Sequence, residues 1–254
     1  MFEGFFAALG FLTIIPPPAN KASGAFGRAP GYFPVIGILE GALFAVIAVT
    51  ARAIGPLAAA GFIIAAHTVI TGGLHLDGLS DTFDSLAVRG SAERKLGVMK
   101  SGTAGPIGAA SVTLALILKT ALLAKALSPG PGYFPFPAAA FFLPVASRWG
   151  MVFTILHGKP AKQEGLGAMV CANTDKSGAV KATMFAAAAI ALWILLFKNG
   201  WFLPVSFAAV YVFSIVSDVF CKKSFGGITG DTIGATSELS EIIFLIPACT
   251  GYFS

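Results

Sequence analysis

Residues 56–84 of the chain read PLAAAGFIIAAHTVITGGLHLDGLSDTFD. The first part of this stretch is almost wholly apolar, and the second carries three aspartates within eight positions, Asp77, Asp81 and Asp84. Spacings of four and three residues place three side chains on one face of a helix. Carboxylates this close repel one another unless a cation lies among them, and Mg²⁺ prefers oxygen ligands. The stretch therefore predicts an apolar span leading into a magnesium and phosphate site; solvated carboxylates at the start of a helix are the alternative.

The composition of the whole chain is typical of a membrane protein. Of its 254 residues 56% are hydrophobic and 11% are charged, and the mean hydropathy is +0.82. A soluble domain has about 25% charged residues, and a chain inside a bilayer must satisfy its backbone groups within its own helices. We therefore expect a single all-α, polytopic integral membrane domain over residues 1–254.

Seven apolar runs are long enough to be read as transmembrane helices, at about residues 33–51, 57–74, 105–127, 134–156, 182–197, 202–220 and 232–250. Residues 2–15 are also apolar but too short to span, and Pro16-Pro17-Pro18 end them. A short re-entrant or interfacial helix is expected there. No basic region precedes this run, so the pattern is not that of a cleavable signal peptide.

The basic residues indicate which loops share a side of the membrane. Seven spans place residues 16–32, 77–104, 157–181 and 221–231 on one face, and twelve of the 17 Lys and Arg residues fall there. These are Lys21, Arg28, Arg89, Arg94, Lys95, Lys100, Lys159, Lys162, Lys176, Lys181, Lys222 and Lys223. The positive-inside rule places this face in the cytoplasm and the C-terminus outside. The same rule accounts for the net charge of +5, so no nucleic-acid partner is expected.

The acidic stretch has a partial echo 154 positions later, although chance matching in a glycine-rich chain is an alternative explanation. Gly72-Gly73 corresponds to Gly226-Gly227, and Asp77 corresponds to Asp231. After the second glycine pair Asp231, Glu238 and Glu241 share one helix face, and acidic residues inside an apolar helix usually serve a function. We therefore predict that two helix ends supply one metal site, with Asp77, Asp81, Asp84, Asp231, Glu238 and Glu241 as ligands.

Further polar residues are candidates for binding substrate or moving a proton. The two glycine pairs can bring backbone N–H groups to a phosphate, or simply pack helices. Arg148 lies inside a span and needs an anionic partner, either a substrate phosphate or a carboxylate such as Glu40. The predicted substrate-binding set is Gly72, Gly73, Lys100, Lys119, Arg148, Gly226, Gly227 and Thr229. Asp84 is the first choice for the general base and His75 the second.

Carboxylates for Mg²⁺, cations for phosphate oxygens and a base for a hydroxyl are the parts of metal-assisted displacement at phosphorus. The residues thus predict a membrane-embedded phosphoryl or nucleotidyl transferase. The main alternative is a polytopic ion-coupled transporter, because internal repeats, glycine-broken helices and intramembrane acids also occur there. A transporter would need carboxylates near the middle of the bilayer, whereas most of these lie near one face.

Two motifs resemble those of a known family. Residues 72–84 resemble the GGxHLDGLxDTxD signature of the cobalamin synthase family, the adenosylcobinamide-GDP ribazoletransferases, and residues 226–241 resemble its GGxTGDTLGAxxELxE motif. Weaker similarities lie at 33–37, at Ser147-Arg148 and at 164–167, so the resemblance runs through the chain in order.

The resemblance implies a multi-pass enzyme of the bacterial inner membrane with Mg²⁺ as cofactor. It would join adenosylcobinamide-GDP to α-ribazole or its 5′-phosphate and release GMP, with the active site facing the cytoplasm. A homo-oligomer, or an association with other cobalamin-assembly enzymes, is compatible with it. One loop departs from the pattern, because Ser101-Gly102-Thr103-Ala104 stand where the family usually has an acidic and a basic residue. This departure weakens a substrate role for the loop and keeps open a non-catalytic scaffold function.

Overall fold

The computed structural model describes residues 3–18, 26–128, 137–162, 165–174, 176–198 and 200–250, and in these parts the chain is helical without a β-strand. The α-helices are α1 (Glu3–Leu12), α2 (Phe33–Thr50), α3 (Pro56–Ile70), α4 (Leu74–Ala87), α5 (Ala92–Met99), α6 (Pro106–Ala126), α7 (Ala138–His157), α8 (Leu166–Asn173), α9 (Lys176–Phe197), α10 (Leu203–Phe225) and α11 (Gly230–Cys249). The all-α prediction is confirmed. Lys21 and Glu164 lie outside the described residues.

Six helices in the described ranges are long and apolar enough to cross a membrane, namely α2, α6, α7, α9, α10 and α11. A seventh crossing requires α3 and α4 together, and these two helices meet at 88°. The 15 residues of α3 extend about 22 Å, less than the roughly 30 Å of a hydrocarbon core. The polytopic architecture is confirmed, but the predicted span at 57–74 ends early, at Ile70.

Gly72 and Gly73 cause this early end. Their φ angles are +61° and +72°, in the left-handed region that glycine adopts without steric cost. Their backbone N–H groups donate to the carbonyls of Val69 and Thr68, which completes the C-terminus of α3. The chain then restarts as α4 in a new direction. The glycine pair therefore turns α4 across the end of the bundle, where it packs against α6 and α11.

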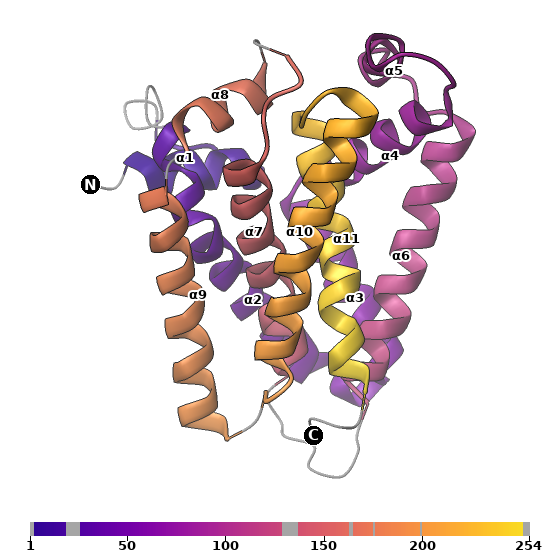
Figure 1. Ribbon diagram of the computed structural model, residues 1–254. Helices are drawn as coiled ribbons and strands as arrows, with labels where there is room; N and C mark the ends of the chain where they lie inside the picture. The colour runs from indigo at the N-terminus through magenta and orange to yellow at the C-terminus, as the bar shows by residue number, and fades with distance from the viewer. Residues whose placement is uncertain are drawn as a thin grey trace.

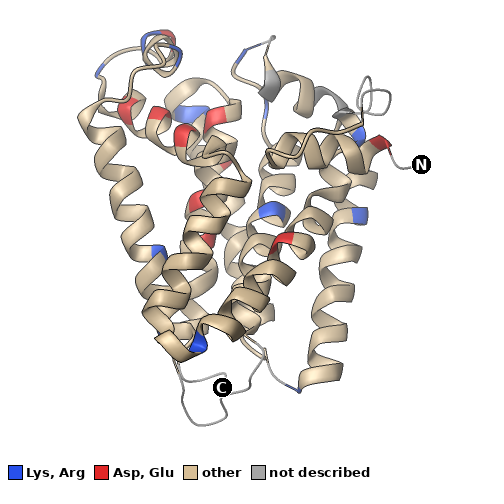
Figure 2. Ribbon diagram, turned by 180° about the vertical axis from the view of Figure 1, so that it is seen from behind, with Lys and Arg blue, Asp and Glu red and all other residues tan. Residues whose placement is uncertain are grey.

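The helices run side by side, and the polar connections collect at one end (Figure 1). The short helices α5 and α8 and the helix α4 lie at this end, and the C-terminal end of α11 lies at the other. Figure 2 shows most of the charged residues at the same end, with a few more inside the bundle. The predicted placement of the long polar loops on one face is confirmed in this arrangement. The side of a membrane that this face meets stays a prediction.

The centre of the bundle is α7, which packs against α2, α10 and α11. Glycine lets α2 approach it closely, because a Cβ at Gly37 would lie 2.7 Å from the carbonyl oxygen of Pro144. Small residues at helix contacts are usual in membrane proteins, since they allow backbone-to-backbone packing. By contrast, α9 exposes large apolar side chains such as Met184, Leu195 and Leu196, as expected of a helix that faces lipid.

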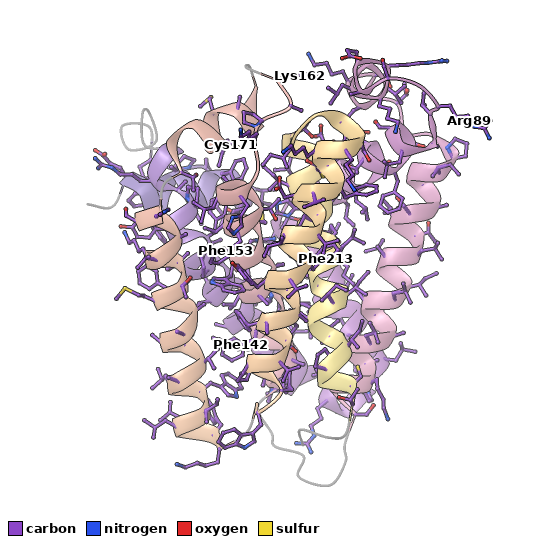
Figure 3. The ribbon with its side chains drawn as sticks, viewed as in Figure 1. Arg89, Phe142, Phe153, Lys162, Cys171 and Phe213 are labelled. Atoms are coloured by element: carbon purple, nitrogen blue, oxygen red, sulfur yellow. The ribbon has the colours of Figure 1, made fainter. Side chains whose placement is uncertain are left out.

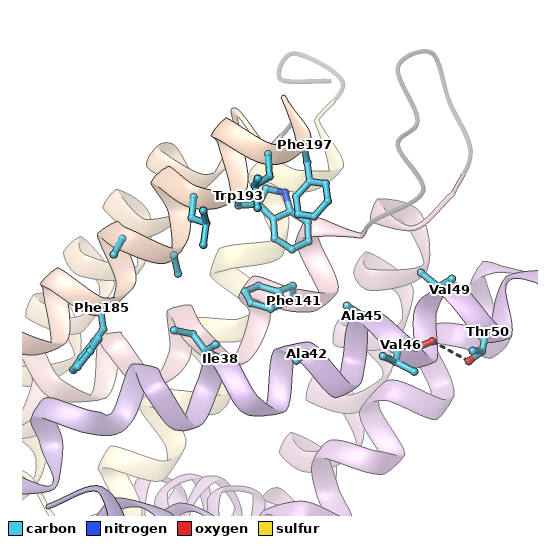
Figure 4. Close-up of a pocket in the computed structure, with 14 residues that line it drawn as sticks. Ile38, Ala42, Ala45, Val46, Val49, Thr50, Phe141, Phe185, Trp193 and Phe197 are labelled. Carbon is cyan, nitrogen blue, oxygen red and sulfur yellow. Dashed lines mark hydrogen bonds between the residues drawn. The ribbon is translucent and has the colours of Figure 1, made fainter. Parts of the chain in front are cut away.

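An apolar groove of about 660 Å³ lies between α2, α7 and α9 (Figure 4). Its walls include Ile38, Val46, Phe141, Trp193 and Phe197, and Thr50 is the most polar residue among those that line it. Among the described residues no acidic or basic side chain lines this groove, so these residues offer nothing to phosphate chemistry. Side chains that can perform such chemistry lie elsewhere, along α4 and α11.

Candidate functional site

The acidic residues of α4 and α11 come together because the two helices touch through glycine. A Cβ at Gly78 would lie 2.7 Å from the carbonyl oxygen of Asp231 and 3.0 Å from its Cα. A Cβ at Gly234 would likewise lie 3.2 Å from the Cα of His75. Only glycine fits at the first of these contacts without movement of the backbone. This contact brings the exposed Asp77 and the half-buried Asp81 beside the start of α11.

The electrostatics of Asp81 show how crowded this acidic face is. Its pKa is raised from 3.8 to about 6, first by burial and then by the negative charges of Asp77, Asp231 and Asp84. A carboxylate whose neighbours are all acidic gains from the arrival of a cation. These four aspartates from two helix ends thus lie near one another, and their shared role in one site stays a prediction.

Asp84 has a second role that its spacing does not reveal. Its Oδ2 accepts a hydrogen bond of 2.6 Å from the backbone N–H of Gly105, and its Oδ1 accepts one of 2.8 Å from Gly108. These are N–H groups of the first turn of α6, which have no partner within that helix. A carboxylate also suits the positive end of the helix dipole. These contacts make Asp84 a cap for α6, and they count against its prediction as general base.

A magnesium ion fits the chemistry of the acidic face. Carboxylate oxygens are the ligands Mg²⁺ prefers, and an ion bound to phosphates needs only one or two of them from the protein. Among the described residues, no three His, Cys, Asp or Glu side chains are already arranged as a metal site. Asp77, Asp81 and Asp231 are the residues that would hold an ion at this face. The metal role of these residues stays a prediction.

Glu238 and Glu241 lie apart from the four aspartates, deeper in the bundle. At 1.5 Å per residue they are about 10 Å and 15 Å along α11 from Asp231. Both are almost fully buried and both accept a hydrogen bond from Lys119 Nζ of α6, at 2.5 and 3.0 Å. Glu241 also accepts one from Ser147 Oγ of α7 at 3.1 Å. The predicted ligand set thus divides into an acidic face and an interior pair, Glu238 and Glu241, that already shares one lysine as its cation.

Arg148 of α7 organises the other half of this interior group. Its Nη2 contacts both carboxylate oxygens of Glu40 at 3.3 and 3.2 Å and His67 Nε2 at 3.1 Å. Its Nη1 donates to Ser237 Oγ at 3.0 Å and lies 3.3 Å from His75 Nδ1. Of the two predicted partners for Arg148, the carboxylate of Glu40 is the one that the structure supplies.

His67 joins the two halves, since its Nδ1 lies 3.5 Å from Glu241 Oε1. The interior network therefore ties together α2, α3, α4, α6, α7 and α11. Buried charges of this kind are costly to leave unpaired, so the network fixes how these helices pack. Lys119 and Arg148 have protein carboxylates as partners, and His75 lies inside the network rather than on the acidic face. The contacts of Lys119 and Arg148 therefore do not support their predicted role in binding substrate.

The glycine pairs and Thr229 are used for backbone geometry. Gly226 has a φ of +80° and ends α10, in the same way that Gly72 and Gly73 end α3. Gly227 permits close passage of the chain at 159–161, because a Cβ there would lie 2.7 Å from Ala161 N. Thr229 caps α11 in a capping box with Thr232. No contact with a phosphate tests their predicted role, but each has a structural function.

One basic residue near the acidic face was not among the predicted site residues. The backbones of Lys159 and Ala161 pair with Ile228 through hydrogen bonds of 2.8 and 2.9 Å, and this places Lys162 close to the start of α11. Lys162 lies at the polar end of the bundle (Figure 3). It lines a cavity of about 210 Å³ together with Lys100, Thr229 and Asp231. From the sequence, Lys162 could be identified only as one of the basic residues of the loop at 157–181.

Comparison with known proteins gives one consistent result. The family model for cobalamin-5-phosphate synthase matches residues 4–249. An adenosylcobinamide-GDP ribazoletransferase from Geotalea daltonii is 34% identical, over 97% of this chain and 96% of the relative. Proteins of the same name from Desulfitobacterium hafniense and Roseiflexus sp. are 32% and 34% identical, over 95% and 94% of this chain and 94% and 86% of their own. No solved structure matches.

Proposed function

This chain belongs to the cobalamin-5-phosphate synthase family, and from that membership we propose that it is an adenosylcobinamide-GDP ribazoletransferase. It joins adenosylcobinamide-GDP to α-ribazole or its 5′-phosphate and releases GMP. We further propose that it works in the bacterial inner membrane, with the polar end of the bundle in the cytoplasm, where twelve of its 17 basic residues fall in the expected loops. It is a transferase of cobalamin biosynthesis and a multi-pass membrane protein.

The observation that carries the chemistry is the convergence of Asp77, Asp81 and Asp231 where α4 and α11 touch. In the proposed reaction a ribose hydroxyl of the acceptor attacks the phosphorus nearer to cobinamide. A new P–O bond forms, the bond from that phosphorus to the oxygen bridging to GMP breaks, and GMP leaves with the bridging oxygen. Mg²⁺ bound at the acidic face would offset the negative charge that collects on the phosphate oxygens.

The remaining parts of the site follow from the same geometry. Lys100 lies beside this face and supplies positive charge for the pyrophosphate. The hydroxyl proton needs an acceptor, and the two candidates are Asp84, which lies on the same helix face as Asp81, and His75. Asp84 has both oxygens engaged by backbone N–H groups at the start of α6, which counts against it as the base.

Reconstitution tests this function directly. The protein in nanodiscs receives adenosylcobinamide-GDP, α-ribazole 5′-phosphate and Mg²⁺, and release of GMP is measured. Asp81→Asn should reduce turnover by at least about a hundredfold while the protein still inserts and remains folded. Normal turnover of Asp81→Asn would remove the acidic face from the mechanism. Omission of Mg²⁺ should likewise stop GMP release from the wild type.

A transporter remains the second candidate, because Glu40, Glu238 and Glu241 are charged groups inside the bundle. Their contacts with Lys119 and Arg148 are those of a closed network, however, and an ion pathway would need to open it. Flux of a substrate or ion across sealed vesicles without GMP formation would favour the transporter. GMP formation without flux would exclude it.

A further inference from the structure

The cavity beside the acidic face is lined by two lysines and by the carboxylate of Asp231. Lys100 follows α5, Lys162 follows the chain segment paired with Ile228, and both line the same cavity. We propose that this cavity binds a phosphate group of a substrate between Lys100 and Lys162, at the N-terminus of α11. The inference rests on the proposed function and assigns Lys162 a place in it.

The two lysines lie closer than like charges favour. Both lysines line the cavity, and the pKa of Lys162 is lowered by desolvation and then by the positive charge of Lys100 and a side-chain contact with it, against a smaller opposing effect of the Asp231 carboxylate. Two neighbouring ammonium groups repel one another until an anion joins them. A phosphate can accept hydrogen bonds from both at once, and such charge-assisted bonds are among the stronger ones.

The start of α11 adds a second source of positive potential to the same cavity. Thr229 and Gly230 line its wall, and α11 continues from Gly230 for 20 residues. The N-terminus of a helix carries a partial positive charge that favours a phosphate, and at α11 this charge is available although the N–H of Thr232 is already bonded to Thr229 Oγ1. The cavity thus has two cationic side chains and the positive end of the α11 dipole, with the Asp231 carboxylate as the opposing charge.

Two further features fit a phosphate that belongs to a substrate of this enzyme. Asp231 lines the cavity and also faces Asp81, so the cavity opens directly beside the acidic face. Leu96, Met99 and Ile228 form its apolar part, against which a sugar or base can pack. The volume of about 210 Å³ suffices for a phosphate and part of a sugar, but not for a corrinoid.

Two substrate phosphates could occupy this position, the 5′-phosphate of the acceptor or the phosphate that leaves with GMP. Lys162→Gln removes the charge and shortens the side chain by one atom, whereas Lys162→Arg keeps the charge. Lys223→Gln is the matched control, because Lys223 is exposed at the same end of the bundle and does not line the cavity.

Steady-state kinetics in nanodiscs distinguish the two sources. If the acceptor phosphate binds here, Lys162→Gln raises the KM for α-ribazole 5′-phosphate about tenfold or more and leaves the KM for α-ribazole unchanged. If the GMP phosphate binds here, the KM for adenosylcobinamide-GDP rises with either acceptor. In both cases Lys162→Arg recovers most of the loss and Lys223→Gln behaves as the wild type. Unchanged KM values for all three substrates in Lys162→Gln would overturn the proposal.

A binding measurement without turnover separates this inference from the proposed function. Inorganic phosphate and ribose 5-phosphate are titrated into the wild type and into Lys100→Gln/Lys162→Gln, in nanodiscs without Mg²⁺. Saturable binding to the wild type that weakens at least tenfold in the double variant supports the cavity, even if no GMP is formed. Equal binding to both proteins refutes it, whatever the enzymatic activity.

Discussion

Gly78→Ala is the smallest change that should disrupt the acidic face, because this glycine holds α4 against α11. The new methyl group would lie 2.7 Å from the carbonyl oxygen of Asp231 and 3.0 Å from its Cα. Carbon and oxygen atoms in ordinary contact are about 3.4 Å apart or more, so the two backbones must separate by roughly 0.7 Å. Both obstructing atoms are backbone, and no side-chain rotation relieves the clash.

The consequence should be larger for catalysis than for folding. A displacement of about 1 Å among groups that position a substrate costs on the order of 10²-fold in rate. A movement of roughly 0.7 Å between Asp81 and Asp231 should therefore lower the kcat for GMP release by about 10- to 100-fold. The apparent affinity for Mg²⁺ should fall with it, because the carboxylates that would hold the ion come from both helices.

Gly61→Ala is the matched control for this experiment. Gly61 lies in α3, and a Cβ at that position would meet no atom within 4 Å. Alanine in a helix is favoured over glycine by roughly 0.5–1 kcal/mol, so this variant should be as stable as the wild type or slightly more stable. GMP release is assayed in nanodiscs and thermal unfolding in detergent for all three proteins. A kcat for Gly78→Ala within twofold of the wild type would refute the reasoning that this helix contact positions the site.

Three further variants address the acidic face, its neighbour and the interior network. The pKa of Asp81 is raised to about 6 in the folded state, so folding favours the protonated form of this residue. Without Mg²⁺, the thermal stability of the wild type should therefore rise as the pH falls from about 7 towards 4, and Asp81→Asn should flatten this profile. Added Mg²⁺ should stabilise the wild type mainly above about pH 6, where Asp81 is ionised; equal stabilisation of Asp81→Asn would contradict this. Asp84→Asn should lower the free energy of unfolding by about 1–3 kcal/mol, because an N–H group of α6 loses its acceptor. A variant of normal stability whose kcat falls more than about 10²-fold would instead support Asp84 as the general base. Lys119→Met leaves Glu238 and Glu241 without their cation and should cost about 3–5 kcal/mol in chemical unfolding, while stability equal to that of the wild type would show the network to be unimportant.

The main features of the fold could be predicted because they depend on local composition. A run of apolar residues is a helix in a bilayer whatever its neighbours are, and basic loops follow one rule of sidedness. The glycine pair Gly72-Gly73 could be recognised in the sequence, but the early end of α3 that it causes could not be predicted. Left-handed backbone at both residues shortens α3 and sets α4 at 88° to it. The predicted span over 57–74 did not include this break.

The site was predicted less completely, since side chains on one helix face need not share a function. Asp84 lies on the same face as Asp81, yet its oxygens bind the start of α6. Glu238 shares the face of Asp231 but lies about 10 Å further along α11, where Lys119 neutralises it. Helical spacing identifies the direction of a side chain but not the group that meets it.

The sequence by itself determined that this chain is an all-α membrane protein, which loops share a face, that Arg148 needs an anion, and that α4 and α11 carry acidic residues. These properties follow from hydropathy, charge and helical periodicity within single segments. The tertiary structure alone decided which carboxylates meet, that Glu40 is the partner of Arg148, and that Lys162 lies beside Lys100. The physical reason is that these contacts join segments far apart in the chain, and backbone approach at positions such as Gly78 sets them.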